Sequence, residues 1–550
     1  MRVAILSTLA LIAPGLAHAA TEEQNLEELR NTVVNLLQAL VDQGVMTREK
    51  AQALVQKAQE KAAVDAKAAA AKDAGAVRVP YVPQTVKDEI SKQVAVDVTP
   101  AVVQGVVEQA KTEGWGVPGA LPDWLSHVRV TGDVRVRGQT DTYSKDNAAT
   151  AAVYLDHNAI NAAGGLQAAG QNAFLNVTHD QDRMRVRARF GVDVQVAPEW
   201  QAGVRLATGS ATDPSSESQN LGINGERYNS GVDLAYVRYT HLAADRFPVF
   251  SLDAGRIRNP WFSPPELDFA RDLTVEGVAA TGRSSFGRGT GPDRDAAFLT
   301  LGAFPVQYTA VASNRAKWLL GAQLGGNLHF TDEDKLTAAL SYYDYVRMPG
   351  VYNTVPDVGT YNYTAPLFLR WGNTVFNIAN SSTNSDARLY ALAADFRLLD
   401  LAATYTHTAG RYTAGINAQA VRNVGYHTND VLLRTGISQA ARNKGYVLDA
   451  SFGDPDPAAR LYAWRGTFGY RYVQRDAVVD SWTDADFHEG GTNAQGFYLS
   501  GEMGLARNVW LRLRYLAANE IDSPIDDTGT AIPGAKYGVD IIQLDLNARF

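Results

Sequence analysis

The sequence predicts an all-β transmembrane barrel of about 16 antiparallel strands (range about 14–18), preceded by a short α-helical region with a coiled-coil-like segment. Three observations lead to this prediction. From Val128 onward, segments of about ten residues alternate between apolar and polar side chains, as a tilted strand that crosses a bilayer must. The connections between these segments alternate between long and short. The last segment runs to the final residue, Phe550, with a period of two.

Residues 1–19 are typical of a cleaved export signal. Arg2 is followed by an apolar run that ends in Ala17-His18-Ala19, where the small residues suit signal peptidase. The run is too short to span a bilayer as a helix, so we expect the mature chain to start near Ala20. Since no later segment offers about 18 uninterrupted apolar residues, the mature chain can enter a membrane as a barrel but not as a helix.

Residues 20–120 are predicted to form a periplasmic α-helical and coiled-coil region. The pattern indicates either a helical hairpin that packs on itself or a module for self-association or cell-wall contact. A short heptad stripe carries the prediction, with spacings of three and four residues between Leu26, Leu29, Val33, Leu36 and Leu40.

Residues 125–550 are predicted to form the barrel. In "HVRVTGDVRVRG", valines occupy one face and arginine, threonine and aspartate the other, and "RMRVRARFGVDVQV" repeats the pattern. The expected strands are 127–138, 182–196, 200–208, 230–242, 249–257, 274–285, 296–305, 316–330, 335–345, 387–398, 400–408, 444–453, 459–473, 495–505, 509–518 and 538–550.

The lengths of the connections distinguish a barrel from a soluble sandwich, in which the terminal segment would be an ordinary edge strand. Outer-membrane barrels combine long outer loops with short periplasmic turns. The long connections here include 139–181, 209–229 and 346–386, whereas "APE", "TDED", "DPDPA" and "ARN" are short. A sandwich gives no reason for this alternation. In a closed barrel the last strand pairs with the first, which explains a chain that ends within a strand.

The composition excludes two further classes of protein. The chain has no cysteine, which excludes a disulfide framework and thiolate metal sites. Its net charge of −8 argues against a nucleic-acid partner, which would favour a basic surface.

Four stretches resemble the bacterial outer-membrane proteins known as the putative porin family. They are "RVPYVPQTVKDEI" with "EGWGVPGALPDWLSHVRVTGDVRVRG", "AGRIRNPWFSPPELDFARDLTVEGVAA", "DADFHEGGTNAQGFYLSGEMGLARNVWLRLRYLAANEID" and the terminal "QLDLNARF". The resemblance implies a porin fold surrounded by outer-membrane lipids. It also implies that Leu544, Leu546 and Phe550 belong to a signal read by the barrel-assembly machinery. A homotrimer is expected for a general porin of this size.

The predicted lumen is rich in arginine. From residue 125 onward the chain holds 34 arginines and five lysines, beside 44 acidic residues. The strand period places a continuous sector of these arginines inward, because closure brings the last strand beside the first. This basic wall consists of Arg129, Arg135, Arg137, Arg183, Arg185, Arg187, Arg189, Arg205, Arg512 and Arg514, to which the same parity adds Arg465, Arg471 and Arg549.

The connection after the fifth predicted strand, "NPWFSPPELDFARD", supplies acidic residues that face this wall. In general porins the corresponding loop folds inward and narrows the channel, so Glu266, Asp268, Asp272 and, just beyond, Glu276 are predicted constriction acids. A basic wall opposite an acidic loop creates a transverse field that orients dipolar solutes. The alternative is that the arginines pair with lumenal carboxylates and only stiffen the barrel.

The sequence therefore predicts an outer-membrane porin for passive diffusion of small hydrophilic solutes, with a lumen that favours anions. The alternative is a structural barrel tethered through its N-terminal helices. An enzyme is less favoured because the nine histidines are scattered, and we expect no catalytic residues, cofactor or metal. "DADFHEGG" offers Asp484, Asp486 and Glu489 as calcium ligands, but its spacing favours ordinary turn chemistry.

Overall fold

The computed structural model describes residues 126–550, apart from 148–153, 211, 290, 310–315, 355–358, 380–386, 524–531 and 533, and five helical positions between 53 and 61. The predicted signal peptide and almost all of the predicted helical region lie outside these residues, so those assignments stay predictions. Within the part that is described, no helix has the length and apolar character needed to cross a membrane.

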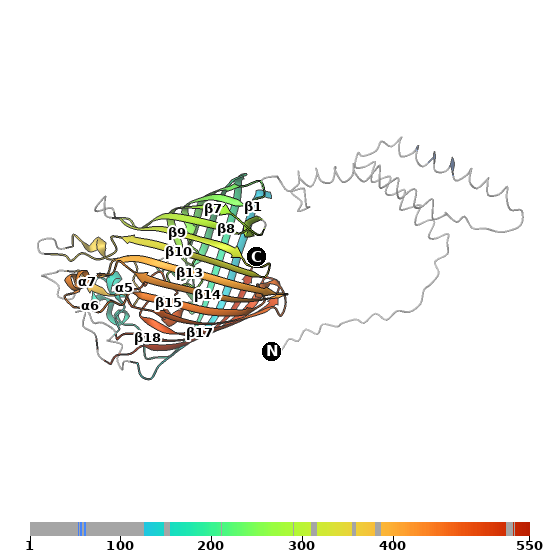
Figure 1. The fold of residues 1–550 in the computed structure, drawn as a ribbon. Coiled ribbons are helices and arrows are strands. Elements are labelled where there is room, and N and C mark those ends of the chain that lie inside the picture. The colour runs from blue at the N-terminus through green and yellow to red at the C-terminus, as the bar shows by residue number, and fades with distance from the viewer. Residues whose placement is uncertain are drawn as a thin grey trace, which may run out of the picture. The chain divides into compact units, whose positions relative to one another are not determined.

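Sixteen antiparallel strands form a closed ring in the described residues, which confirms the predicted barrel (Figure 1). The ring consists of β1 (Val128–Tyr143), β2 (Gln181–Ala197), β3 (Trp200–Thr208), β5 (Ser230–Leu242), β6 (Pro248–Arg258), β7 (Thr274–Ser285), β8 (Ala296–Gln307), β9 (Lys317–His329), β10 (Asp334–Val346), β13 (Phe396–Ala409), β14 (Tyr412–Asn423), β15 (Lys444–Gly453), β16 (Trp464–Val473), β17 (Ala494–Ala506), β18 (Val509–Glu520) and β19 (Gly538–Arg549).

Short elements occupy the connections. The two-residue strand β4 (Gln219–Asn220) pairs with β2, and β11 (Val375–Asn377) pairs with β12 (Tyr390–Leu392). The helices are α5 (His157–Ala163), α6 (Leu166–Ala169) and α7 (Thr428–Thr435), with 3-10 turns η3 (Gly170–Ala173), η4 (Gly291–Asp293), η5 (Asn362–Thr364), η6 (Pro457–Ala459) and η7 (Phe487–Glu489).

Long and short connections lie at opposite ends of the barrel. The C-terminus lies at the short-turn end, and α5, α6 and α7 lie at the long-loop end (Figure 1). At the short-turn end, for example, the β13–β14 connection is residues 410–411, whereas residues 347–395 connect β10 to β13 at the other end. In outer-membrane barrels, the end with short turns generally faces the periplasm.

The seam that closes the ring includes the last residue of the chain. β19 pairs with β1 from Tyr143↔Val539 to Asp133↔Arg549. The amide of Phe550 then donates to the carbonyl of Gly132 at 2.9 Å, and an oxygen of its terminal carboxylate accepts from the Gly132 amide at 3.0 Å. A Cβ atom at Gly132 would lie 2.4 Å from the Phe550 ring, so the ring occupies the space that glycine leaves. The final strand is therefore paired to its end.

One predicted hairpin was wrong. The sequence placed strands at 387–398 and 400–408, but β13 runs through Leu399, and the turn is at Gly410, where φ is +60°. Residues 389–394 are apolar at both parities, so alternation does not show whether they belong to a strand or to a loop. Tyr390 and the alanines that follow it are instead fully buried within the outer loop, next to β11.

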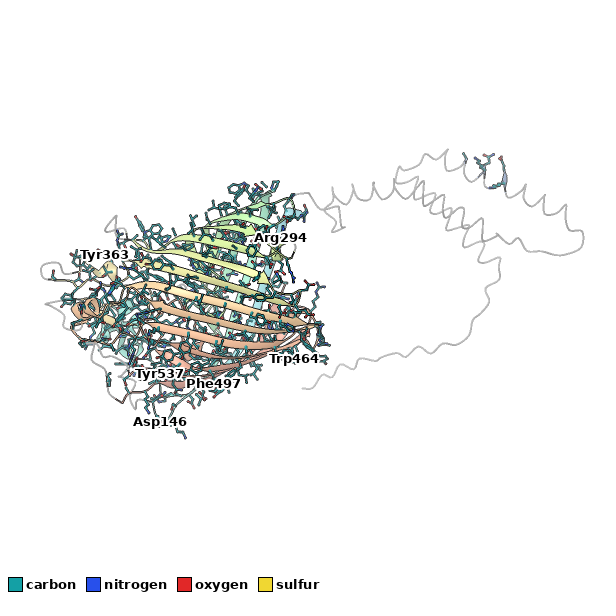
Figure 2. All side chains as sticks on the ribbon, viewed as in Figure 1. Asp146, Arg294, Tyr363, Trp464, Phe497 and Tyr537 are labelled. Carbon is teal, nitrogen blue, oxygen red and sulfur yellow. The ribbon has the colours of Figure 1, made fainter. Side chains whose placement is uncertain are left out.

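The lipid-facing surface carries aromatic residues towards both ends. Near the short turns, the rings of Trp200 and Tyr239 lie 5.0 Å apart, and those of Phe452 and Trp464 lie 5.9 Å apart. Towards the long loops, Tyr446 stacks on Tyr472 at 5.1 Å. Figure 2 shows Trp464 at the short-turn end, as expected for an interfacial belt.

An apolar core lies inside the ring on the side of β8, β9 and β10. Two connections, 259–273 and 474–493, supply part of it. Trp261 and Phe269 from the first pack on Tyr343 of β10, with ring centroids 5.2 and 5.1 Å apart. Trp482 from the second packs on Tyr345 at 5.5 Å. The two connections, called here the first and second inward loops, therefore fold into the lumen.

Candidate functional site

The inward faces of β1 and β2 bring arginines directly opposite one another. The register pairs Arg135 with Arg187 and Arg137 with Arg185. Like charges in cross-strand pairs destabilise a sheet unless counter-charges compensate them. The number of arginines that carboxylates neutralise therefore determines how much positive charge the wall presents to a solute.

Carboxylates on the barrel wall neutralise part of the arginine row. Arg137 is 1% exposed and donates to both oxygens of Asp545, at 2.6 and 3.0 Å. Asp133 accepts from Arg187 at 2.9 Å and from Arg189 at 2.6 Å. These pairs are partly buried and charge-assisted, so they fix the guanidinium planes.

The first inward loop, residues 259–273, crosses to the arginine wall from the opposite side of the barrel. The Phe262 amide donates to Gln323 of β9 at 2.8 Å. Gln419 of β14 donates to Asp268 at 2.8 Å. At the far end of the loop, Asp272 accepts from Arg187 at 2.9 Å and lies 3.4 Å from Arg189. The loop thus narrows the lumen.

The four predicted constriction acids have different surroundings. Asp272 meets the basic wall, whereas Glu266 pairs with Arg271 of the same loop at 3.0 Å. Asp268 is 1% exposed and faces the barrel wall rather than the arginines. Glu276 must be corrected, because it lies within β7 and pairs with Arg256 of β6 at 2.6 Å. The chain turns back into the sheet at Thr274, which takes Glu276 out of the loop.

The second inward loop, residues 474–493, supplies acids that were not predicted to enter the lumen. Asp486 accepts from Arg137 and Arg514 at 2.8 Å each and lies 4.0 Å from Arg185. Glu489 accepts from Arg183 at 3.0 Å. The sequence signal was the apolar content of "DAVVDSW", since Val478, Val479 and Trp482 would otherwise be exposed on an outer loop.

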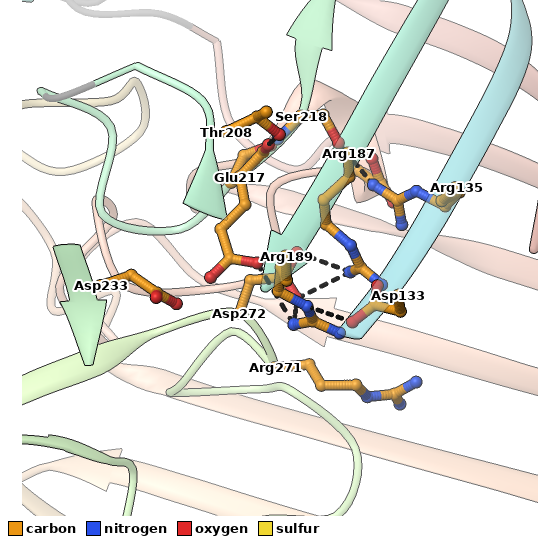
Figure 3. A network of polar contacts seen from close by, with 12 residues as sticks. Asp133, Arg135, Arg187, Arg189, Thr208, Glu217, Ser218, Asp233, Arg271 and Asp272 are labelled. Atoms are coloured by element: carbon orange, nitrogen blue, oxygen red, sulfur yellow. Dashed lines mark hydrogen bonds and ion pairs between the residues drawn. The ribbon is translucent and has the colours of Figure 1, made fainter. Parts of the chain in front are cut away.

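The connection 209–229, like the two inward loops, contributes an acidic residue that contacts the arginine wall. Glu217 accepts from Arg189 at 3.2 Å and from Arg205 of β3 at 3.3 Å, and Arg205 also pairs with Asp233. The adjacent Ser218 accepts from Arg135. Figure 3 shows this network, in which the guanidinium groups of Arg187 and Arg189 lie between Asp133 and Asp272.

The three acids considered as calcium ligands and set aside in favour of turn chemistry have other partners. Asp486 and Glu489 are occupied by arginines, and Asp484 lies 3.6 Å from Arg471. In the described residues, no group of three or more acidic or histidine side chains could hold a metal ion.

A family model described as "putative porin" matches residues 30–550. The chain belongs to the putative porin family. Membership supports an outer-membrane channel, in agreement with the closed barrel. No protein with a curated description matches the chain.

Several solved structures are similar to this porin at low sequence identity. Pseudomonas putida OprB is 9% identical, with a TM-score of 0.44 over 80% of this chain and 97% of that one. Salmonella typhi OmpF is 12% identical, with a TM-score of 0.36 over 77% and 97%. Vibrio cholerae OmpT is 9% identical, with a TM-score of 0.37 over 77% and 99%.

A cavity of 650 Å³ lies in the lumen of the porin, against the arginine wall. Ten arginines and six carboxylates line it, so its charge is basic. The lining includes Arg129, Arg135, Arg187, Arg189, Arg205, Arg512 and Arg514, all predicted for the wall. The other three predicted arginines, Arg137, Arg183 and Arg185, face the second inward loop. Arg258 and Arg271 also line the cavity, although strand parity did not identify them.

The pKa values of two loop carboxyls in the lumen are shifted in opposite directions. Burial and the nearby carboxylate of Asp272 raise the pKa of Glu217 to about 8, although Arg189 and Arg205 oppose this. Burial also disfavours the charged form of Asp486, but Arg137 and Arg514 hold its pKa well below the usual range. Asp486 is therefore a permanent negative charge, whereas Glu217 changes charge near neutral pH.

The ratio of anion to cation permeability through the barrel is expected to fall as pH rises from 6 to 9. Glu217 is largely neutral below its pKa of about 8 and gains a negative charge above it, beside Arg189, Arg205, Asp233 and Asp272. The added charge repels anions. Reversal potentials in a KCl gradient at each pH measure the change.

Substitution of Glu217 separates this effect from other titrations. Glu217→Gln stays neutral and is expected to remove the step near pH 8. Glu226→Gln is a matched control, because Glu226 is exposed on the same connection. A step that survives in Glu217→Gln would assign the titration to another group.

Proposed function

We propose that this barrel is a passive channel for small hydrophilic solutes and that its arginine wall favours anions. The observation that carries the proposal is the basic lining of the 650 Å³ cavity, with ten arginines and six carboxylates. Arginine supports passage of carboxylate or phosphate groups, because its planar guanidinium offers fixed donors. The family match supports the channel itself but does not extend to its solutes.

The same proposal includes the orientation of the chain. β1 starts at the short-turn end, so residues 20–120 are proposed to lie in the periplasm. The homotrimer and the contact with the barrel-assembly machinery stay predictions from the sequence.

Planar-bilayer conductance of the purified protein tests the channel, and the reversal potential in a KCl gradient tests its preference. We expect stepwise conductance with anion preference, and a shift of the reversal potential towards cation preference in Arg185→Gln/Arg187→Gln. These arginines face Asp486 and Asp272, so their loss leaves lumenal carboxylates unopposed.

A matched control removes two arginines from the outside of the barrel. Arg397 and Arg422 are exposed on the outward faces of β13 and β14, so Arg397→Gln/Arg422→Gln changes the net charge equally and is expected to leave the reversal potential unchanged. Equal shifts in both variants would contradict the basic wall. A folded barrel that does not conduct would favour the structural alternative.

A further inference from the structure

Four arginines of the lumenal cavity have no carboxylate partner, or only a distant one, in the described part of the chain: Arg129, which is exposed near the start of β1, and Arg135, Arg258 and Arg512. Among the described residues, no carboxylate lies within 4 Å of the Arg135 or Arg258 guanidinium, and the nearest to Arg512 is Glu502 at 3.5 Å. Arg135 donates to the hydroxyl of Ser218, which carries no charge. The guanidinium groups of Arg135, Arg258 and Arg512 come from β1, β6 and β18, and all three line the same cavity.

The carboxylates of the cavity are mostly committed elsewhere. Asp133 and Asp272 accept from Arg187 and Arg189, Asp486 accepts from Arg514, and Glu266 pairs with Arg271. The positive charge of Arg135 and Arg258 is therefore left facing the space, and that of Arg512 is opposed only by Glu502 at 3.5 Å. Guanidinium groups held in a partly desolvated wall bind oxyanions with charge-assisted, often bidentate hydrogen bonds.

The size and the number of free charges together restrict the ligand. A cavity of 650 Å³ falls within the range of sites for small molecules. One monovalent anion neutralises one guanidinium and leaves the others unpaired. A molecule with several oxyanion groups can engage more than one at a time, and the second contact then forms within the same molecule.

We propose that this cavity is a binding site for small polyanions, meaning molecules of metabolite size that carry two or more carboxylate or phosphate groups, held by Arg135, Arg258 and Arg512. The inference rests on the proposed function, because it assumes that solutes reach the lumen. It goes beyond that function because it predicts saturable occupancy at named residues, which a general basic lining does not require. A bound polyanion slows the flow of smaller anions through the same space.

Citrate and pyrophosphate are the probes, with acetate as a monovalent comparison at equal ionic strength. In planar bilayers, we expect citrate or pyrophosphate to reduce the chloride current of the full-length protein in a saturable manner, and acetate to have little effect. A response to citrate alone identifies carboxylate recognition, and a response to pyrophosphate alone identifies phosphate recognition. The combined Arg135→Gln/Arg258→Gln/Arg512→Gln variant is expected to raise the half-blocking concentration at least about tenfold, since each charge-assisted contact is lost.

Calorimetric titration of the detergent-solubilised protein measures binding without requiring a conducting pore. Saturable citrate or pyrophosphate binding that the triple variant loses supports the site, even for a barrel that does not conduct. Arg397→Gln/Arg422→Gln, which removes two positive charges outside the lumen, is the charge control for the corresponding double variant Arg135→Gln/Arg258→Gln, and a β-sheet circular dichroism spectrum controls for folding. An anion-preferring channel that polyanions neither block nor bind overturns this inference but leaves the proposed function intact. Equal binding by the folded triple variant also overturns it.

Discussion

Deletion of Phe550 is expected to prevent accumulation of the folded barrel in the outer membrane while leaving export to the periplasm intact. The deletion removes two backbone hydrogen bonds to Gly132 and the ring that covers this glycine. Each bond contributes about 1 kcal/mol in ordinary surroundings, and an unpaired group that faces lipid costs several times more. The pairing of β19 with β1 closes the ring, so no other strand can supply hydrogen bonds in place of the lost ones.

The resemblance of "QLDLNARF" to an assembly signal predicts the same outcome through recognition rather than stability. Leu544 and Leu546 point outward with Phe550, each about half exposed, so the three side chains form one apolar row on β19. Immunoblots of periplasmic and outer-membrane fractions, with and without boiling, measure export and folding separately. Normal levels of folded outer-membrane protein would contradict both explanations.

Substitution at Gly132 distinguishes a loss of seam stability from a loss of the assembly signal. Gly132→Val leaves the C-terminal sequence intact, but its Cβ would meet the Phe550 ring at 2.4 Å and the Arg189 carbonyl at 2.8 Å. We expect Gly132→Val to lower the amount of folded barrel if closure of the seam is limiting. Phe550→Tyr is the matched control, because it keeps the aromatic ring and the backbone bonds.

Strand parity made most of the barrel predictable. In β1 and β2, apolar residues alternate with arginine and other mostly polar residues over 128–137 and 183–196, so the period of two fixes both the strand and the side of the barrel that each arginine faces. The same argument fails between β12 and β13. Tyr390 to Ala394 are apolar at both parities because they are buried inside an outer loop, and periodicity cannot separate a loop core from a strand.

The partners of the arginines were less predictable than the arginines themselves. Asp133 and Asp545 share a strand face with them, so parity includes both. Asp272 and Asp486 reach the wall on loops whose paths depend on contacts far along the chain, such as the Ala270 amide donating to the Trp482 carbonyl at 2.7 Å. No local pattern encodes such a path. The family resemblance supplied an inward loop at 259–273 but none at 474–493.

These two loop acids determine how much of the basic wall a solute meets. Asp272 holds Arg187 and Arg189, and Asp486 holds Arg137 and Arg514. Each carboxylate is partly buried between guanidinium groups, so its removal leaves positive charge without a partner at the narrowed part of the lumen. The loops therefore limit an anion preference that the strands alone would make stronger.

Neutralising both acids in Asp272→Asn/Asp486→Asn is accordingly expected to increase anion preference, the opposite direction to the loss of Arg185 and Arg187. At about 5 Å and an effective dielectric constant near 20, one unit charge changes the energy of a passing monovalent ion by about 3 kcal/mol before salt screening. Screening reduces this effect, so we expect the Cl⁻/K⁺ permeability ratio to rise by about tenfold in dilute KCl and less at 1 M.

Reversal potentials of the variant in KCl gradients measure this ratio, and Asp182→Asn/Asp540→Asn is the control. Asp182 and Asp540 are exposed on the outward faces of β2 and β19, where they accept from Thr140 and Tyr515, so the change of net charge is the same. If the loops line the path of the ions, the lumenal variant alone changes selectivity. Unchanged selectivity in a folded Asp272→Asn/Asp486→Asn barrel would mean that ions pass elsewhere, and the paired arginines would then act as a scaffold for the wall.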